Sequence, residues 1–406
     1  MAFFYKIIYN CEIFYGGIIM KAIVNTKLIL EDGIIFDGVI LFDNGIIKAL
    51  GKTSDVEIPD GCEIIDAKGK YTCPGFIDIH CHGAGENHFY DNTEECCQHF
   101  IEHGETTVLP TLYMDLSIDD IIEKSQIIKS RSDKGVCRIM DGLYMETPYM
   151  NFSGSFKSKN KVPENIVPED YERMLAAVGN HVRVWAIDPA REGIDDFMAY
   201  AQKNYPKSIF ALGHSSASSD DCKRVSKYGV KVQTHHNDSG KAKGRCQGSI
   251  GAGCDEYTLY NPDMYAELIV DETGIHVVPD RIKMVVRTKG VEKIILISDS
   301  TTTVSNFKNN EAEGIWYSPD LNYDDRGMLA GSRLTVDNAC RNMMVHTGYG
   351  LCHAIRMATA NPAKMLGIYD TVGTLDVGKR ANLLIINDEV RVEKVFLDGE
   401  LMVDKA

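Results

Sequence analysis

The stretch Pro74-Gly75-Phe76-Ile77-Asp78-Ile79-His80-Cys81-His82 decides the fold of this chain. Its apolar residues predict a buried strand that ends in two histidines. Because residues i and i+2 of a strand point to the same face, His80 and His82 project together while Cys81 points away. Two imidazoles side by side at a strand end are typical of a catalytic metal site at the carboxyl end of a parallel barrel.

Further short apolar runs follow this strand. The runs lie at 75–80, 106–113, 136–146, 182–188, 208–214, 230–235, 267–270 and 293–298. Helix-like segments separate most of them; Ile118–Lys129, for example, spaces its apolar residues for one helix face. The run at 267–270 overlaps Asp263–Val270, which we expect to belong partly to a helix. Eight buried strands alternating with helices predict an α/β fold, a (β/α)8 TIM-like barrel.

The two ends of the chain predict a smaller unit made of β structure. Strands are expected at Lys21–Leu30, Gly38–Asp43, Gly45–Leu50, Gly373–Leu375, Ala381–Ile386, Val392–Leu397 and Leu401–Val403. Between the barrel and the closing strands, Asp337–Thr347 and Cys352–Met365 are expected to be helical. Because β segments flank the barrel on both sides, we expect the two ends to pair into one small β-sandwich domain.

These patterns divide the chain into two domains and an extension. We expect the β-sandwich domain at residues 20–73 plus 371–406 and the barrel at 74–370. Residues 1–19 are apolar but interrupted by polar residues, which makes a poor signal peptide. Since Met20 is a natural start, we expect residues 1–19 to be a start-site extension.

Composition and charge exclude several classes of function. The chain is 44% hydrophobic and 25% charged, as ordinary globular proteins are. Its net charge of -15 argues against a nucleic-acid surface, which needs a basic face. No apolar run reaches the ~18 residues of a membrane span. The twelve cysteines form no CxxC pair, so we expect free thiols in a cytoplasmic protein.

Six residues at the ends of the predicted strands carry the candidate chemistry. They are His80, His82, Glu146, His214, His235 and Asp299. Each has a structural explanation when taken alone, since a strand-end histidine is commonly a hydrogen-bonded structural residue and Asp299 could cap the next helix. Their shared position at the carboxyl ends of strands favours a metal centre instead. The local pattern does not choose between His235 and His236, because neighbours on a strand face opposite ways.

Histidine and carboxylate ligands suit zinc best, although Fe2+, Mn2+ and Co2+ bind such sets too. One or two ions fit, with Glu146 as the bridge in the second case. A bound ion lowers the pKa of its water to about 7. Asp299 is the candidate catalytic base, placed to take a proton from that water and to return it to a leaving amine. This set suits hydrolysis of an amide or a related C–N bond.

A basic loop after the sixth strand contains Lys241, Lys243 and Arg245. It lies on the side of the barrel where substrates bind, and Arg245 could hold a phosphate or carboxylate through two hydrogen bonds. A solvated loop without a binding role is the alternative.

Together the motifs resemble the amidohydrolase superfamily, and within it the branch that deacetylates amino-sugar phosphates. The supporting segments are Pro74–Asp78, Thr106-Thr107, Pro110-Thr111, Gly142–Glu146, Leu212–Ser215, Thr234-His235, Gly244-Arg245, Ser298-Asp299, Leu329–Thr335 and Ala360–Ala363. The resemblance implies metal ligation by Glu146, His214 and His235, which selects His235 over His236. It implies that Asp299 is the catalytic base. The residues that it implies for substrate binding are Asn237, Arg245 and His276, and it implies a homodimer.

By this resemblance the chain is expected to be a metal-dependent deacetylase. N-acetylglucosamine-6-phosphate and water would give glucosamine-6-phosphate and acetate. The alternatives are hydrolysis of another small amide, such as an N-acyl amino acid or a cyclic amide, and a barrel that has lost catalysis. Neither a nucleic acid nor a membrane is an expected partner.

The chain departs from the branch beside Glu146. Tyr144-Met145-Glu146-Thr147-Pro148 replaces His-Leu-Glu-Gly-Pro, and Asn237-Asp238 replaces Asn-Ala. No histidine stands in Phe152–Lys157, where the branch places the one that polarises the substrate carbonyl. Our hypothesis is that the His80/His82 pair recruits a second metal ion for this task.

Overall fold

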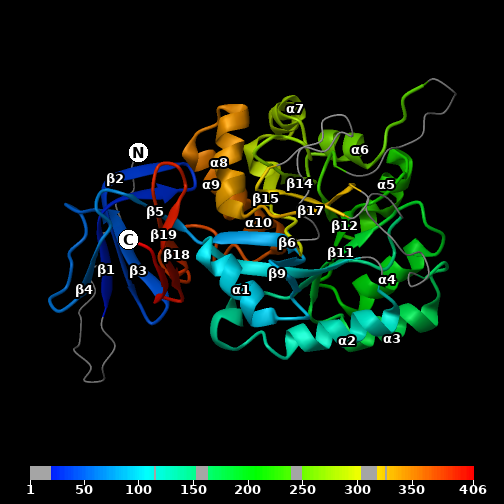
Figure 1. Ribbon diagram of the computed structural model, residues 1–406, viewed down its shortest axis with the longest axis horizontal. Coiled ribbons are helices and arrows are strands. Elements are labelled where there is room, and N and C mark those ends of the chain that lie inside the picture. The colour runs from blue at the N-terminus through cyan, green and yellow to red at the C-terminus, as the bar shows by residue number, and fades with distance from the viewer. Residues whose placement is uncertain (1–19, 114–115, 152–162, 239–248, 303–317, 325–326) are drawn as a thin grey trace.

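The computed structural model describes residues 20–113, 116–151, 163–238, 249–302, 318–324 and 327–406. Eight parallel strands surrounded by helices form one part, and a smaller sheet lies beside it (Figure 1). The barrel strands are β6 (Phe76–Cys81), β9 (Glu105–Tyr113), β10 (Leu143–Glu146), β11 (Val182–Ile187), β12 (Ile209–Leu212), β13 (Val230–Gln233), β14 (Tyr265–Ile269) and β15 (Ile294–Ile297). Their side chains are mostly buried, as expected when helices cover a closed parallel sheet. The predicted barrel is confirmed.

The strands pair in chain order from β6 to β15. Main-chain hydrogen bonds just beyond the carboxyl ends bring the first and last strands together. The N–H of His82 donates to the Ser300 carbonyl at 2.7 Å, and the N–H of Asp299 donates to the His80 carbonyl at 2.9 Å. The seam of the barrel therefore lies at predicted site residues.

Helices cover the outside of the barrel. They are α1 (Thr93–Glu102), α2 (Ile118–Lys129), α3 (Pro168–Val178), α4 (Ile194–Asn204), α5 (Ser219–Val225), α6 (Cys254–Tyr260), α7 (Pro279–Lys289), α8 (Val336–Thr347), α9 (Leu351–Ala358) and α10 (Ala360–Leu366). The predicted helix at Ile118–Lys129 is confirmed; it begins with a capping box in which Ser117 and Asp120 bond each other's backbone N–H. Among the described residues, no helix combines the length and apolarity of a membrane span.

The smaller sheet joins both ends of the chain. Its strands are β1 (Lys21–Leu30), β2 (Gly33–Asp43), β3 (Ile46–Lys52), β4 (Glu63–Asp66), β5 (Tyr71–Pro74), β18 (Leu383–Ile386), β19 (Val392–Leu397) and β20 (Glu400–Asp404). Antiparallel pairing of β5 with β18 connects the early strands to the late ones, which lie together as blue and red arrows in Figure 1.

This sheet curls around a core of its own. Three strands lie between β2, which carries Phe42, and β19, which carries Phe396, yet the two ring centroids are 5.6 Å apart in an edge-to-face contact. An isolated bridge between Ile46 and Arg380 helps to close the curl. The two sides of one hydrogen-bonded sheet thus face each other, as the layers of a sandwich do.

Four short strands complete the described β structure. They are β7 (Gly83–Ala84), β8 (Asn87–His88), β16 (Leu321–Tyr323) and β17 (Leu329–Ser332).

Several predicted boundaries were wrong. The run at 136–146 contains a 3-10 helix, Gly135–Ile139, before β10, because Gly142 with φ 113° interrupts the extended backbone. Asp263–Val270 contributes no helix, since Tyr265–Ile269 pairs with both neighbouring strands. The predicted strand at Gly373–Leu375 is a bend, in which Gly373 has φ 94° and packs closely on Ala363.

The predicted helix at Cys352–Met365 is two helices. Thr359, with φ -137° and ψ -76°, separates α9 from α10. Pro362 explains the break, because a proline lacks the N–H that would bond the carbonyl four residues earlier and its ring clashes there. That earlier residue is Ala358, the last residue of α9.

Candidate metal centre

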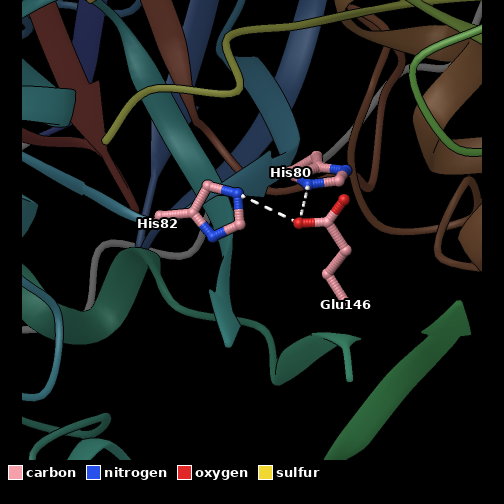
Figure 2. Close-up of side chains that lie close together, drawn as sticks. All are labelled: His80, His82 and Glu146. Atoms are coloured by element: carbon pink, nitrogen blue, oxygen red, sulfur yellow. Dashed lines mark ion pairs between the residues drawn. The ribbon is translucent and has the colours of Figure 1, made fainter. Parts of the chain in front are cut away.

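Glu146, the last residue of β10, lies between two pairs of histidines at the carboxyl end of the barrel. Its Oε1 lies 2.9 Å from His214 Nε2 and 2.8 Å from His235 Nε2. Its Oε2 lies 3.4 Å from His82 Nε2 and 3.6 Å from His80 Nε2, as Figure 2 shows. Each oxygen of one carboxylate therefore faces its own pair of imidazoles.

Asp299 follows β15 and completes the cluster. Its Oδ1 lies 3.0 Å from His82 Nε2 and 3.4 Å from His80 Nε2. The structure thus brings together all six residues predicted for the centre, and each of them is buried. The donor atoms form two groups that share Glu146, and within each group they lie within 4.8 Å of one another. One group is His80, His82 and Glu146; the other is Glu146, His214 and His235.

An unusual main-chain conformation sets the direction of three of these side chains. His214 has φ 39°, His235 has φ 24° and Asp299 has φ 51°, each in the left-handed region just after a strand. Such backbone costs about 1–3 kcal/mol at a residue other than glycine. It persists where the surrounding structure enforces it, and here it occurs at three of the six clustered residues.

The other ring nitrogen of each histidine in the first pair faces an acceptor. His80 Nδ1 lies 3.2 Å from Glu267 Oε2, and His82 Nδ1 lies 3.2 Å from the Thr111 carbonyl. An imidazole whose Nδ1 donates a proton presents the lone pair of Nε2. His80 Nε2 is buried and has no hydrogen-bond partner among the described residues. This arrangement fits a metal ligand.

Charges within the cluster shift the pKa values of its members. Burial raises the pKa of Glu146, but the imidazoles of His214, His235 and His80 outweigh it and hold this pKa well below its usual range. Burial lowers the pKa of His235, yet Glu146 raises it overall to about 9. The pKa of Asp299 is lowered despite burial, chiefly by His82 and His80. Both carboxyl groups are therefore ionised at neutral pH.

His236 points away from the cluster. Its Nδ1 lies 2.6 Å from Gln233 Oε1 and its N–H donates to the Glu267 carbonyl. Burial lowers its pKa to about 3, so the ring is neutral. The choice of His235 for the site agrees with this geometry.

Two residues predicted to bind substrate lie beside the cluster. His276 Nδ1 lies 3.2 Å from Asp271 Oδ2, and its Nε2 lies 3.3 Å from the carbonyl of Gly331. Gly331 is next to Ser332, whose N–H donates to the Asp299 carbonyl. Asn237 follows the centre by two residues, and its Oδ1 accepts a hydrogen bond from Arg281.

The third such residue, Arg245, lies outside the described residues, as do Lys241, Lys243 and Phe152–Lys157.

Two residues outside the predicted site, Glu267 and Tyr144, contact His80 from the interior of the barrel. Glu267 lies in β14 and contacts His80. The Tyr144 ring packs on the His80 ring with centroids 4.5 Å apart, while its hydroxyl lies 2.7 Å from Thr234 Oγ1. A lone charged residue inside an apolar strand was the signal for Glu267, and the replacement of a histidine of the deacetylase branch was the signal for Tyr144.

Comparisons with known proteins agree with this geometry. The model of the Amidohydrolase family matches residues 71–402. N-acetylglucosamine-6-phosphate deacetylase of Haemophilus influenzae is 25% identical over 393 residues, 93% of this chain and 98% of that protein. N-acetylgalactosamine-6-phosphate deacetylase of Escherichia coli O157:H7 is 25% identical, over 92% of this chain and 97% of that protein.

Solved structures share the fold. N-acetylglucosamine-6-phosphate deacetylase from Pasteurella multocida superposes with a TM-score of 0.81 at 23% identity, over 95% of this chain and all of that one. A mutant of the Mycobacterium smegmatis deacetylase, in complex with N-acetyl-D-glucosamine-6-phosphate, gives a TM-score of 0.79 at 22% identity, over 96% of this chain and all of that one.

Proposed function

We propose a deacetylase function for this chain, which belongs to the amidohydrolase family. The reaction is hydrolysis of the N-acetyl group of an amino-sugar 6-phosphate, with release of acetate and the free amine. The observation that carries the proposal is the position of Glu146 between two histidine pairs, with Asp299 beside them at the carboxyl end of the barrel. The two curated relatives differ in the sugar, which is an N-acetylglucosamine derivative for one and an N-acetylgalactosamine derivative for the other. The experiment below therefore compares both sugars.

The donor set would hold divalent metal ions. Glu146 Oε1 with His214 and His235 would hold one ion, and Glu146 Oε2 with His80, His82 and Asp299 would hold a second. We propose zinc, with Fe2+, Mn2+ and Co2+ as the alternatives, because imidazole and carboxylate suit all four. A bound ion of this kind lowers the pKa of water to about 7 and polarises a carbonyl oxygen. The buried, unbonded Nε2 of His80 supports the second site.

Asp299 would move the proton. Because neighbouring imidazoles lower its pKa, its carboxylate is unprotonated at neutral pH and can accept the proton of the attacking water. The same group would return that proton to the nitrogen of the sugar as the C–N bond breaks. Burial of the cluster excludes bulk water, which strengthens these interactions.

His276 and its neighbours would hold the phosphate. Burial lowers the pKa of His276, but the hydrogen bond to Asp271 and the charges of Asp238 and Asp271 raise it to about 9. The imidazole is therefore cationic at neutral pH and suits an anionic substrate. Asn237 and Arg245 complete the proposed set.

The resemblance to the deacetylase branch also supports a homodimer, and the cysteines support a cytoplasmic location. The ten cysteines in the described part of the chain are all free thiols, which fits a reducing compartment.

The experiment measures acetate release by zinc-loaded protein. The substrates are N-acetylglucosamine-6-phosphate, N-acetylgalactosamine-6-phosphate and unphosphorylated N-acetylglucosamine, and Asp299→Asn is the variant. We expect fast release from a phosphorylated sugar, reduced about a hundredfold to ten-thousandfold in the variant. Absence of release from all three sugars would refute the proposal and direct the search to N-acyl amino acids and cyclic amides.

A further inference from the structure

We propose that Glu267 is a positioning residue that fixes His80 for the second metal site. The inference rests on the two-ion centre of the proposed function and deepens it. It concerns a carboxylate that would not touch the ion and would act only through the imidazole of His80.

Glu267 occupies the interior of the barrel behind the cluster. It lies in β14 and is 0% exposed. Its Oε2 lies 3.2 Å from His80 Nδ1 and 3.2 Å from the N–H of His235. One oxygen thus contacts one residue from each histidine pair.

The contact determines which nitrogen of His80 is the ligand. A carboxylate only accepts hydrogen bonds, so the proton of a neutral His80 is on Nδ1. The lone pair of Nε2 is then directed at Glu146 Oε2, 3.6 Å away, and Asp299 Oδ1, 3.4 Å away. The Tyr144 ring, packed on the imidazole, prevents the ring from turning. Partners of this kind strengthen metal affinity by about 10- to 100-fold.

The fold itself does not need a carboxylate at this position. An ionised group in a barrel interior costs several kcal/mol unless it is paired. The neighbours Leu268 and Ile269 show that aliphatic side chains fit the same strand. His82 obtains the same orientation from the Thr111 carbonyl, a main-chain group. Within the His80/His82 pair, His80 takes its orientation from a side chain and His82 takes it from the main chain, and this difference is the functional reason for Glu267.

Two variants separate the acceptor from the volume of the side chain. Glu267→Gln keeps an oxygen that can accept from His80 Nδ1, whereas Glu267→Leu fills similar space without an acceptor. Glu105→Gln is the matched control, because Glu105 is also 0% exposed in a barrel strand but bonds the N–H of Val336 at the other end. Each protein is stripped with chelator, titrated with Zn2+ and Co2+, and analysed for bound metal by mass spectrometry and for Co2+ absorption.

We expect two ions per chain in the wild type and in Glu105→Gln. Glu267→Gln should bind two with the second weakened about tenfold, and Glu267→Leu should bind one, with the Co2+ spectrum of a His80→Ala variant. Two ions bound by Glu267→Leu with wild-type affinity would overturn the inference. If Glu267→Leu does not fold by circular dichroism, Glu267→Met takes its place, because it also lacks the acceptor, and two ions bound by it with wild-type affinity overturn the inference.

Acetate release, measured on the same samples, distinguishes the two proposals. A wild type that binds two ions without releasing acetate from any of the three sugars refutes the proposed function and leaves the role of Glu267 standing. A wild type that releases acetate with only one bound ion overturns the role of Glu267 and leaves the function standing.

Discussion

His82 Nε2 lies 3.0 Å from Asp299 Oδ1, although 217 residues separate them along the chain. The two residues follow the first and last strands of the barrel, whose seam is closed beside them by the hydrogen bond from Asp299 N–H to the His80 carbonyl. Closure of the barrel and assembly of the candidate centre are therefore one structural event.

Removal of the first histidine pair should convert a two-ion centre into a one-ion centre. We expect the double variant His80→Ala, His82→Ala to bind one Zn2+ per chain and to release acetate about a hundredfold more slowly, because the ion that polarises the carbonyl is lost. Metal analysis and initial rates test this. Full activity in the double variant would refute the hypothesis that the second ion polarises the carbonyl.

Glu146→Gln should impair both metal sites at once. The amide keeps the volume of the side chain but loses the charge, and its NH2 group faces one of the two imidazole pairs. We expect weaker binding of both ions and a loss of acetate release of about a thousandfold or more. Isothermal titration with Zn2+ measures the affinities, and Glu105→Gln controls for the replacement of a buried glutamate by glutamine. Unchanged binding of either ion would show that Glu146 does not bridge.

Arg245→Ala should weaken binding of phosphorylated substrates only. A charge-assisted hydrogen bond is worth about 1.5–3 kcal/mol, so KM for the phosphorylated sugar should rise about 10- to 100-fold. Hydrolysis of the unphosphorylated sugar should not change. Lys241→Ala, in the same loop, is the control. Equal effects of Arg245→Ala on both sugars would place Arg245 outside phosphate recognition.

The His276–Asp271 pair predicts a loss of stability at alkaline pH. The pKa of His276 is raised from 6.5 to about 9 in the folded chain. The contribution of the protonated His276 to the free energy of unfolding is therefore complete below about pH 6.5 and is lost as the pH rises through 9. The shift corresponds to about 3 kcal/mol. Urea unfolding between pH 6 and pH 10 should show this decline in the wild type and a flatter profile in Asp271→Asn. Parallel profiles would contradict the prediction.

Sequence patterns predict the barrel well because a parallel strand buried on both faces is a continuous apolar run. The six strand-end residues are predictable for the same reason, since the carboxyl ends of all strands meet at one edge of the barrel. Sequence position alone does not give distances across the barrel. The contact between Glu267 and His80 therefore emerged only from the structure.

Local chemistry explains the errors in element boundaries. Pro362 divides the helix predicted at Cys352–Met365 into two helices, and Gly142 interrupts the strand predicted at 136–146. The curl that brings Phe42 to Phe396 depends on tertiary packing, which no short window of sequence contains.

The pairing of β5 with β18 has a consequence for the order of events during synthesis. The N–H of Gly75, one residue before β6, donates to the Asn382 carbonyl at 2.8 Å. The ribosome synthesises the chain from its N-terminus at about 5–20 residues per second. The strand that carries His80 is therefore made long before the segment that contains Asn382. One edge of β5, the strand just before β6, therefore stays unpaired on the nascent chain until β18 is made. The small sheet beside the barrel is therefore completed only after the last strands of the chain have left the ribosome.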